Sequence, residues 1–404
     1  MEKERLWTKD FMTVSVINFL VFLIHFLLLV TIAAYAVDKF QASTGMAGLV
    51  AGIFIIGALI GRLGAGRLTE IASSKKILMI GIILFIITCL LYFAAINLIL
   101  LVIVRLFNGI AYGVASTATG TIVAQIIPDN RRGEGIGYYS LGAVLAVALG
   151  PFLGILSLHY LHSMMIFVVA SILAFISFVL SFRVTDQTNP KPRPVRPEAS
   201  EQFQLEKYLE LKAVPISLVA LTIGLSYSVV LAFMSLYALE LHLEKAASFY
   251  FLVYSAAVLV SRPFSGRLLD VRGANIVMYP CFFIYCVGML LFSQADHGIT
   301  LLAAGVIIGL GYGNFISCAQ AMSLKGIPAK RLGLATSTFF IFVDLGFGAG
   351  PYLLGSLVPL TGYRGLFLAM IAFILAAAVL YHFLLGKRVA APATPDGPMS
   401  CDCK

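Results

Sequence analysis

Charged residues are scarce in this 404-residue sequence: they make up 12% of it, whereas soluble domains carry roughly a quarter. Hydrophobic residues make up 60%, and the mean hydropathy is +0.98. No water-soluble fold could bury that much apolar surface. The composition therefore excludes a soluble protein and predicts a chain that is solvated by lipid.

The sequence also lacks the cysteines of a disulfide framework and the motifs of an enzyme. Four of its six cysteines lie inside apolar runs, and the other two, Cys401 and Cys403, are too few thiolates for a closed zinc site. The motifs His-Glu-x-x-His, Gly-x-Ser-x-Gly and the phosphate loop are missing. We therefore expect no enzyme, no cofactor, no bound metal and no ATP-driven pump.

Apolar runs of about 20 residues, by contrast, recur along almost the whole chain, and this length crosses ~30 Å of hydrocarbon as an α-helix. The first run is too long for a signal-peptide core and has no small-residue cleavage site, so we expect it to be retained. We predict an all-α polytopic membrane protein with twelve membrane-spanning helices, at about 11–37, 45–66, 77–96, 98–122, 135–157, 163–183, 213–238, 246–266, 275–294, 299–322, 332–356 and 364–386.

The basic residues indicate membrane topology. The net charge is +9, but Lys and Arg are spread over alternate loops instead of forming a nucleic-acid-binding patch. If the N-terminus is cytoplasmic, most of the loop cations face the cytoplasm, and only Lys39, Lys245 and Arg364 face outside. By the positive-inside rule we expect both termini in the cytoplasm of a bacterial cell, and no nucleic-acid partner.

The second half of the chain repeats the first at an offset of 200 residues. At this shift Arg62, Gly66, Arg67 and Leu68 fall on identical residues, and Glu70 falls on Asp270. The same register aligns Gly109, Tyr112, Gly113, Ile127, Pro128, Arg131, Gly133, Gly150 and Pro151 with identical residues. One register that serves separated motifs without gaps indicates an internal duplication.

The repeat and the linker composition predict the domain organisation. Six spans in each half give both halves the same orientation, so the repeat is parallel. Residues 185–212 form a Pro-rich basic linker that we expect to be solvated and to end in a short surface helix from about 200 to 212. We predict bundles at 1–184 and 213–388 and a disordered tail at 389–404.

The loop from Gly66 to Glu70 and its second copy from Gly266 to Asp270 resemble the signature of the major facilitator superfamily, and within it the twelve-span drug/proton antiporters. Here Glu70 stands where the family has Asp, and Ser73-Ser74 replace Gly-Arg. The resemblance covers nearly the whole chain. It implies two six-helix bundles around a central cavity that is lined by spans 1, 4, 7 and 10, and transport of a small molecule.

The two loop copies predict a cytoplasmic gate. Glycine lets a helix end approach its neighbour, and an acid there can meet the partial positive charge of a helix N-terminus. We expect Glu70 to meet Arg331, and Asp270 to meet Arg131, closing the cytoplasmic side. The alternative is that these acids and bases only mark solvated loop ends.

Span 5 carries Gly142, Ala146, Gly150-Pro151 and Gly154 at intervals of four residues. The pattern resembles the glycine-rich antiporter signature of that span. Small residues at this spacing form a smooth face for close helix packing, and proline bends the helix. Ordinary tight packing, without any link to the direction of transport, is the alternative.

Charges inside spans are candidates for function because they are costly in the bilayer. Arg105 begins a polar face of span 4, followed by Asn108, Tyr112, Ser116 and Thr119. The segment from Arg105 to Gly109 resembles the family signature in which the arginine takes part in proton coupling. The alternative is a structural arginine that binds carbonyl groups. Asp344, in span 11, is a candidate proton site or a helix-packing contact.

Two further spans carry polar candidates. Asn18 and His25 are seven residues apart and share a face of span 1, and Asn314 lies in span 10. His25 could carry a proton because histidine titrates near neutral pH, or it could be a satisfied core residue. At the 200-residue offset Arg105, His25 and Asp344 fall on Gly305, Leu225 and Val144, so these ionisable residues are not duplicated.

We therefore expect a monomeric secondary transporter in the lipid bilayer that exports a small organic molecule, a drug or a secreted metabolite, in exchange for protons. A proton symporter that imports a solute is the nearest alternative. A membrane receptor or a passive channel is a more distant one.

Overall fold

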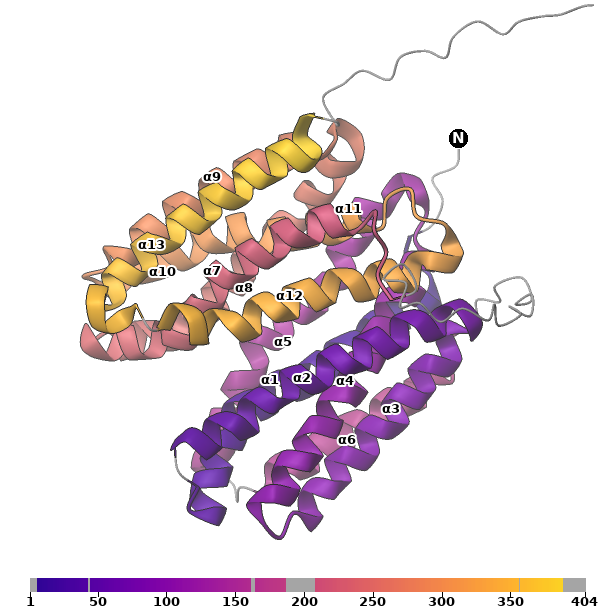
Figure 1. Ribbon diagram of the computed structural model, residues 1–404, viewed down its shortest axis with the longest axis horizontal. Helices are drawn as coiled ribbons and strands as arrows, with labels where there is room; N and C mark the ends of the chain where they lie inside the picture. The colour runs from indigo at the N-terminus through magenta and orange to yellow at the C-terminus, as the bar shows by residue number, and fades with distance from the viewer. Residues whose placement is uncertain (1–5, 43, 161–163, 187–207, 356, 388–404) are drawn as a thin grey trace, which may run out of the picture.

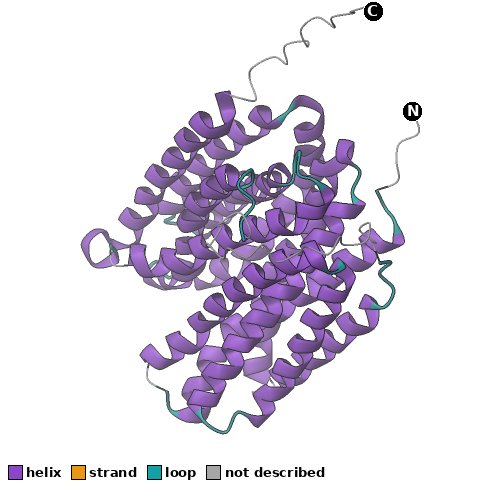
Figure 2. Ribbon diagram, turned by 45° about the vertical axis from the view of Figure 1, so that its right-hand side comes forward, coloured by secondary structure: helices purple, strands orange, loops and turns teal. Residues whose placement is uncertain are grey.

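The structure is a computed structural model, which describes residues 6–42, 44–160, 164–186, 208–355 and 357–387. Over these ranges the chain is helical and has no strand (Figure 2). Twelve helical segments are long and apolar enough to cross a membrane. The predicted fold class is confirmed. The tail with Cys401 and Cys403, and the predicted surface helix up to residue 207, lie outside the described residues. The rest of that predicted helix, residues 208–212, forms turns and a bend instead.

Each half contributes six spans, and their bounds differ from the apolar runs by a few residues in either direction. In the first half they are α1 (Lys9–Phe40), α2 (Thr44–Ile71), α3 (Ser74–Leu91), α4 (Leu98–Ile126), α5 (Arg132–Tyr160) and α6 (Met164–Ser181). A polar cap explains the earlier start of α1: the Thr8 hydroxyl accepts a hydrogen bond from Phe11 N at 3.1 Å, and the helix begins two residues before the predicted run.

The spans of the second half are α7 (Val214–Glu240), α8 (Glu244–Arg272), α9 (Ala274–Ser293), α10 (Gly298–Ile308) with α11 (Asn314–Ser323), α12 (Leu332–Gly355) and α13 (Val358–Tyr381). The predicted tenth span is thus divided, because a π-helical turn, η4 (Gly309–Gly313), joins α10 to α11. A second π-helical turn, η6 (His382–Gly386), continues α13.

The two halves meet at one end and diverge at the other (Figure 1). They meet at the end where α1 begins and α13 finishes, which we call the termini side. Contacts between the halves run mainly along two helix pairs, α2 with α12 and α5 with α8. These pairs are related by the 200-residue repeat, so the interface has the symmetry of the duplication.

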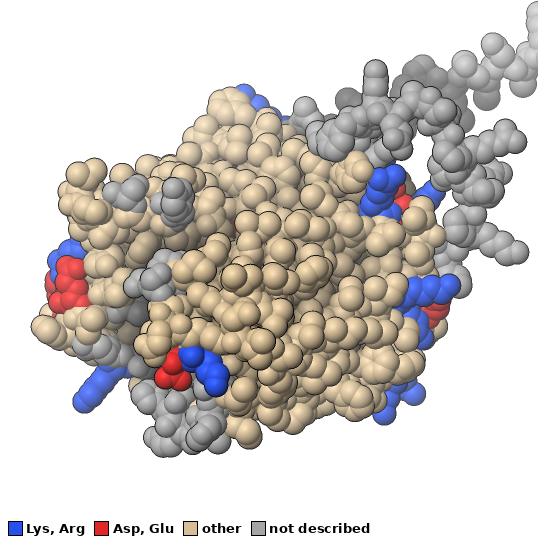
Figure 3. Space-filling model, turned by 60° about the horizontal axis from the view of Figure 1, so that its bottom comes forward, with Lys and Arg blue, Asp and Glu red and all other residues tan. Residues whose placement is uncertain are grey.

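The outer surface is apolar. Ile96, Ile299 and Leu360 have exposed fractions of 82%, 83% and 82%. On the face shown in Figure 3 a broad central area has no Lys, Arg, Asp or Glu side chain, and these side chains lie toward its edges. Such an apolar area is stable against lipid tails and not against water.

Glycines hold α2 and α4 at close range. A Cβ atom on Gly109 would lie 2.2 Å from the carbonyl oxygen of Phe54, and one on Gly113 would lie 2.3 Å from that of Ala58. The second half repeats the arrangement, with Gly309 against the Tyr254 carbonyl oxygen at 2.7 Å. The offset found in the sequence therefore relates contacts as well as residues.

We expect Gly109→Ala to lower the free energy of unfolding by about 1–3 kcal/mol, because the methyl group must displace the α2 backbone. Gly64→Ala is the matched control on α2, since nothing lies within 4 Å of its added Cβ. Thermal unfolding of the two purified variants in detergent measures the difference. Equal melting temperatures would show that the α2–α4 contact is not tight.

Candidate functional site

A cavity of about 620 Å³ lies between the two halves, which both contribute to its lining. Toward the termini side it is lined by Arg62, Arg262 and Asp344, which we call the cavity floor. Toward the opposite side its lining reaches Ala51 and Ala232. Because Ala51 lies near the start of α2 and Ala232 near the end of α7, the cavity faces the side opposite the termini.

Close contacts shut the termini side below the floor. A Cβ atom on Gly266 would lie 2.7 Å from the Gly133 carbonyl oxygen, and one on Gly66 would lie 2.6 Å from Ser337 Cβ. Arg132 donates across the halves to the Leu324 carbonyl oxygen at 2.6 Å. Both glycines that were predicted at the gate therefore lie at a contact between the halves.

The acid of the second loop copy caps a helix. Asp270 accepts hydrogen bonds from the backbone N–H groups of Gly133 at 2.7 Å and Glu134 at 2.9 Å, at the start of α5. Arg131 and Arg267 both pair with Glu134, at 2.9 and 3.0 Å. Asp270, which we expected to meet Arg131, thus binds the backbone amides at the start of α5. Glu134, which was not predicted from the sequence, links Arg131 to Arg267.

The acid of the first copy lies near Arg331. Arg331 and Lys330 interact electrostatically with Glu70. Arg331 also forms an ion pair with Glu210 at 2.6 Å. The backbone N–H of Glu210 donates to the Thr338 hydroxyl at 2.9 Å, so the end of the linker docks on α12. This docking was not predicted from the sequence.

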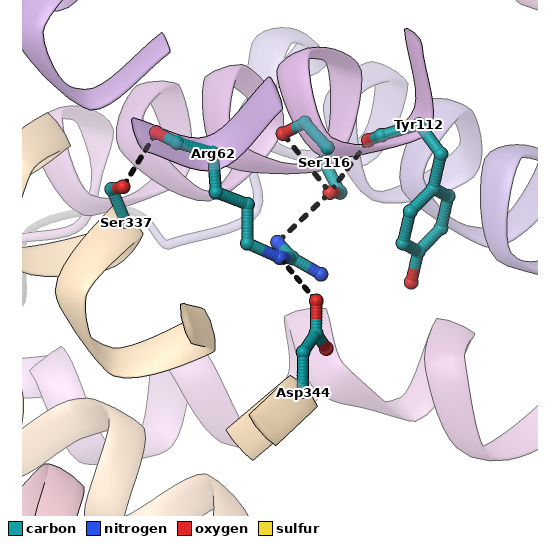
Figure 4. Close-up of polar contacts among 6 residues, drawn as sticks. Arg62, Tyr112, Ser116, Ser337 and Asp344 are labelled. Atoms are coloured by element: carbon teal, nitrogen blue, oxygen red, sulfur yellow. Dashed lines mark hydrogen bonds and ion pairs between the residues drawn. The ribbon is translucent and has the colours of Figure 1, made fainter. Parts of the chain in front are cut away.

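An ion pair joins the two halves at the cavity floor (Figure 4). Arg62 Nε lies 2.6 Å from Asp344 Oδ2, and Arg62 also donates to the Ser116 hydroxyl at 3.0 Å. The Ser337 hydroxyl donates to the carbonyl oxygen of Arg62 at 2.6 Å. Arg62 is 1% exposed and the Asp344 side chain 18%, so the aspartate is the partner that the cavity can reach.

Aromatic rings form the walls above the floor. His25 stacks on Phe54 with ring centroids 4.5 Å apart and lies 4.8 Å from the ring of Tyr112. On the other wall Tyr227 stacks on Tyr312 at 3.8 Å. Within the described chain His25 Nδ1 has no hydrogen-bond partner. The cavity therefore offers flat apolar surfaces and few polar groups.

Asn18 lines the cavity, where its amide oxygen accepts hydrogen bonds from the hydroxyls of Tyr139 at 2.8 Å and Thr119 at 3.3 Å. These bonds join α1, α4 and α5 within the first half. Asn18 is therefore a fixed part of the wall.

Three predicted residues lie away from the cavity. Arg105 is fully buried, donates to Asn108 at 3.3 Å, and has its guanidinium 4.3 Å from the centre of the Phe54 ring. Asn108 donates to Thr88 of α3 at 2.9 Å, and Asn314 bonds Ser265 and Ser261 of α8. Of the predicted polar face of α4, Tyr112 lines the cavity and Arg105 and Asn108 do not. Phe54 of α2 covers the guanidinium of Arg105, whereas Asn108 and Asn314 bond to the neighbouring helices α3 and α8.

The predicted small face of α5 packs on α1. Cβ atoms on Gly142, Gly150 and Gly154 would lie 3.2, 2.6 and 2.9 Å from side-chain atoms of Phe19, Phe26 and Thr31. Pro151 lies inside the helix. The motif therefore fixes the α1–α5 contact behind the cavity wall.

The sequence model of the Major Facilitator Superfamily matches residues 14–328 and 245–399 of the chain. This chain belongs to the major facilitator superfamily. It is therefore a membrane transporter, as the resemblance implied, and not an enzyme. The human organic anion transporter MFSD10 (TETRAN) shares the fold: the TM-score is 0.73 at 14% identity, over 92% of this chain and 98% of that one.

Two relatives in the superfamily match most of the chain, and a third matches a part of it. The uncharacterized MFS-type transporter YhhS of Escherichia coli K12 is 24% identical over 387 residues, 93% of this chain and 92% of its own. The uncharacterized MFS-type transporter MJ1560 of Methanocaldococcus jannaschii is 24% identical over 331 residues, 79% of this chain and 84% of its own. The galactose-proton symporter of Escherichia coli K12 is 33% identical over 126 residues, 31% of this chain and 27% of its own.

The first prediction for the site concerns the ion pair. Asp344→Asn leaves the buried Arg62 without its counter-ion, and we expect it to lower the free energy of unfolding by about 3 kcal/mol. The double variant Arg62→Gln, Asp344→Asn should recover part of this loss. Chemical unfolding of the four proteins in detergent gives the coupling energy between the two residues.

Asp296→Asn is the control for that cycle. Asp296 pairs with Arg364 on the surface, where water screens the charges, so we expect little change in stability. If the effects of the two floor substitutions simply add, Arg62 and Asp344 do not stabilise each other.

The second prediction concerns the helix cap. Asp270→Asn removes the negative charge at the N-terminus of α5 and so destabilises the closed termini side by about 1 kcal/mol. This free energy changes the ratio of closed to open molecules about fivefold. We expect a cysteine at Ala143, in the cavity wall, to react about five times faster with a thiol reagent applied from the termini side. Asp38→Asn, at the far end of α1, is the control. An unchanged labelling rate contradicts a gating role for Asp270.

Proposed function

We propose that this chain is a proton-coupled exporter of a small organic molecule that works by alternating access. The observation that carries the proposal is the ion pair between Arg62 and Asp344 on the cavity floor, 2.6 Å long and formed between the two halves. A carboxylate that both faces the cavity and holds the halves together can couple its protonation to their movement.

The ionised form of Asp344 favours the conformation described above, in which the termini side is closed. When a proton enters through the cavity and binds Asp344, the attraction to Arg62 is lost. The α2–α12 contact weakens, and the halves rock open on the termini side. There the proton leaves, substrate enters the cavity, and the pair forms again as the halves return. One cycle moves a proton inward and a substrate outward.

The basic loops support an orientation with the termini side in the cytoplasm of the cell. One charge that crosses 100 mV releases about 2.3 kcal/mol, enough for roughly a fifty-fold concentration ratio. A single proton at Asp344 therefore suffices for useful export. The α5 motif at Gly142, Gly150, Pro151 and Gly154 resembles that of drug/proton antiporters and supports this direction. His25, above the floor, is a second position from which a proton could reach Asp344.

Import by proton symport is the second candidate. It is favoured by the similarity of a part of the chain to the galactose-proton symporter, 33% over 126 residues. The same ion pair would then respond to joint binding of proton and solute. Vesicle orientation separates the two functions: everted vesicles accumulate the substrate of an exporter when the lumen is acidified.

The substrate can be found by comparing the small molecules retained by cells with and without the protein. In everted vesicles we expect the wild type to accumulate the retained compound when the lumen is acidic, and Asp344→Asn to lose at least about tenfold of this accumulation. The variant should still bind the compound in detergent, because the cavity stays open on the termini side. Asp296→Asn is the control. Gradient-driven accumulation by Asp344→Asn contradicts the assigned proton site.

A further inference from the structure

The charges of the cavity do not balance. Arg62 and Arg262 both line its floor, and among the lining residues Asp344 is the one carboxylate. Asp344 forms an ion pair with Arg62. The cavity therefore carries an uncompensated cation, and Arg105, buried behind Phe54, adds a second positive charge nearby. A buried charge without a counter-ion is unfavourable, so the empty cavity favours an anion.

Arg262 is a buried cation with an unsatisfied donor. It is 1% exposed, donates to the Ser140 hydroxyl across the halves, and donates to the Gly313 carbonyl oxygen at 2.8 Å. Its Nε has no hydrogen-bond partner in the described part of the chain. A guanidinium carries five N–H donors in a planar fork, and the geometry of that fork matches a carboxylate. Two donors are used here.

The duplication explains why this arginine is left without an acid. Arg62 and Arg262 occupy equivalent positions on α2 and α8, and each reaches across to the other half. The position equivalent to Asp344 is Val144 on α5, whose carbonyl oxygen accepts a bond from Ser255 of α8 at 3.2 Å. The first arginine is thus neutralised by the protein, and the second has a valine where its acid would stand.

We propose that Arg262 binds the acidic group of the substrate, so that the transported molecule is an organic anion. This inference rests on the proposed function, in which the cavity holds the substrate. The stacked rings of Tyr227 and Tyr312 border the floor and provide a flat face for an aromatic or apolar body. The substrate class is therefore a carboxylic or similar acid that carries such a body.

The test uses three probes with one ring system and different charge: 1-naphthaleneacetate, its neutral amide, and 1-naphthylmethylamine. Calorimetry on the full chain in lipid nanodiscs gives their dissociation constants. We expect the wild type to bind the acid at least about tenfold more tightly than the amide, as for a charge-assisted hydrogen bond, and to bind the amine most weakly.

Two variants remove the preference by different routes. Arg262→Gln removes the cation, and Val144→Asp supplies an internal carboxylate at the position equivalent to Asp344. In both we expect acid and amide to bind alike. Arg272→Gln, at the exposed end of the same helix, should keep the wild-type preference. Equal binding of acid and amide by the wild type, no binding of the acid, or a preference that survives both substitutions overturns the proposal.

These measurements need no proton gradient, so the two proposals can fail separately. Loss of gradient-driven accumulation with the anion preference intact rejects proton coupling alone. Normal accumulation of a neutral or cationic compound, with no anion preference, rejects the role of Arg262 alone.

Discussion

A guanidinium and a carboxylate from different halves of the chain meet at the floor of a cavity that is otherwise walled by aromatic rings. In water such an ion pair contributes little to stability. In a site with few other polar groups, removal of one partner leaves the other as a buried charge without a counter-ion, which is strongly destabilising. In the proposed mechanism the α2–α12 contact and the closure of the termini side depend on this pair being intact. Asp344 is the partner that a proton can reach through the cavity.

The packing around the pair leaves little freedom for intermediate positions. Glycines bring α2 against α4 and α5 against α1 within the first half, and α8 against α5 between the halves. We expect the close packing within a half to keep it rigid, so that the polar contacts between halves, such as Asp270 at the start of α5, set the balance of two end states. Local protonation can then become a movement of the whole bundle.

Much of the fold could be predicted because the bilayer imposes one length scale on every span. The apolar runs indicate the number of helices, and the 200-residue offset indicates which helix of the second half corresponds to each helix of the first. The division of the tenth span at Gly309–Gly313 could not be predicted, because a π-helical turn depends on packing against Tyr254 and Tyr285 and not on hydropathy.

The site was only partly predictable. Asp344 stands out as an acid in an apolar run, whereas Arg62 and Arg262 fall near the ends of the predicted runs 45–66 and 246–266, where a cation is ordinary. The signal that could have found them is their identity across the repeat. Contact between Arg62 and Asp344, 282 residues apart, cannot be inferred from one sequence. The burial of Arg105 depends on how α2 crosses α4.

In the proposed mechanism protonation of Asp344 opens the termini side. The distance between spin labels at Lys76 and Arg272, on the two halves at that side, reports this opening as the pH is lowered. We expect the wild type to shift from a short to a long distance, and Asp344→Asn to show the long distance at every pH. A distance that changes with neither the pH nor the substitution would contradict this mechanism.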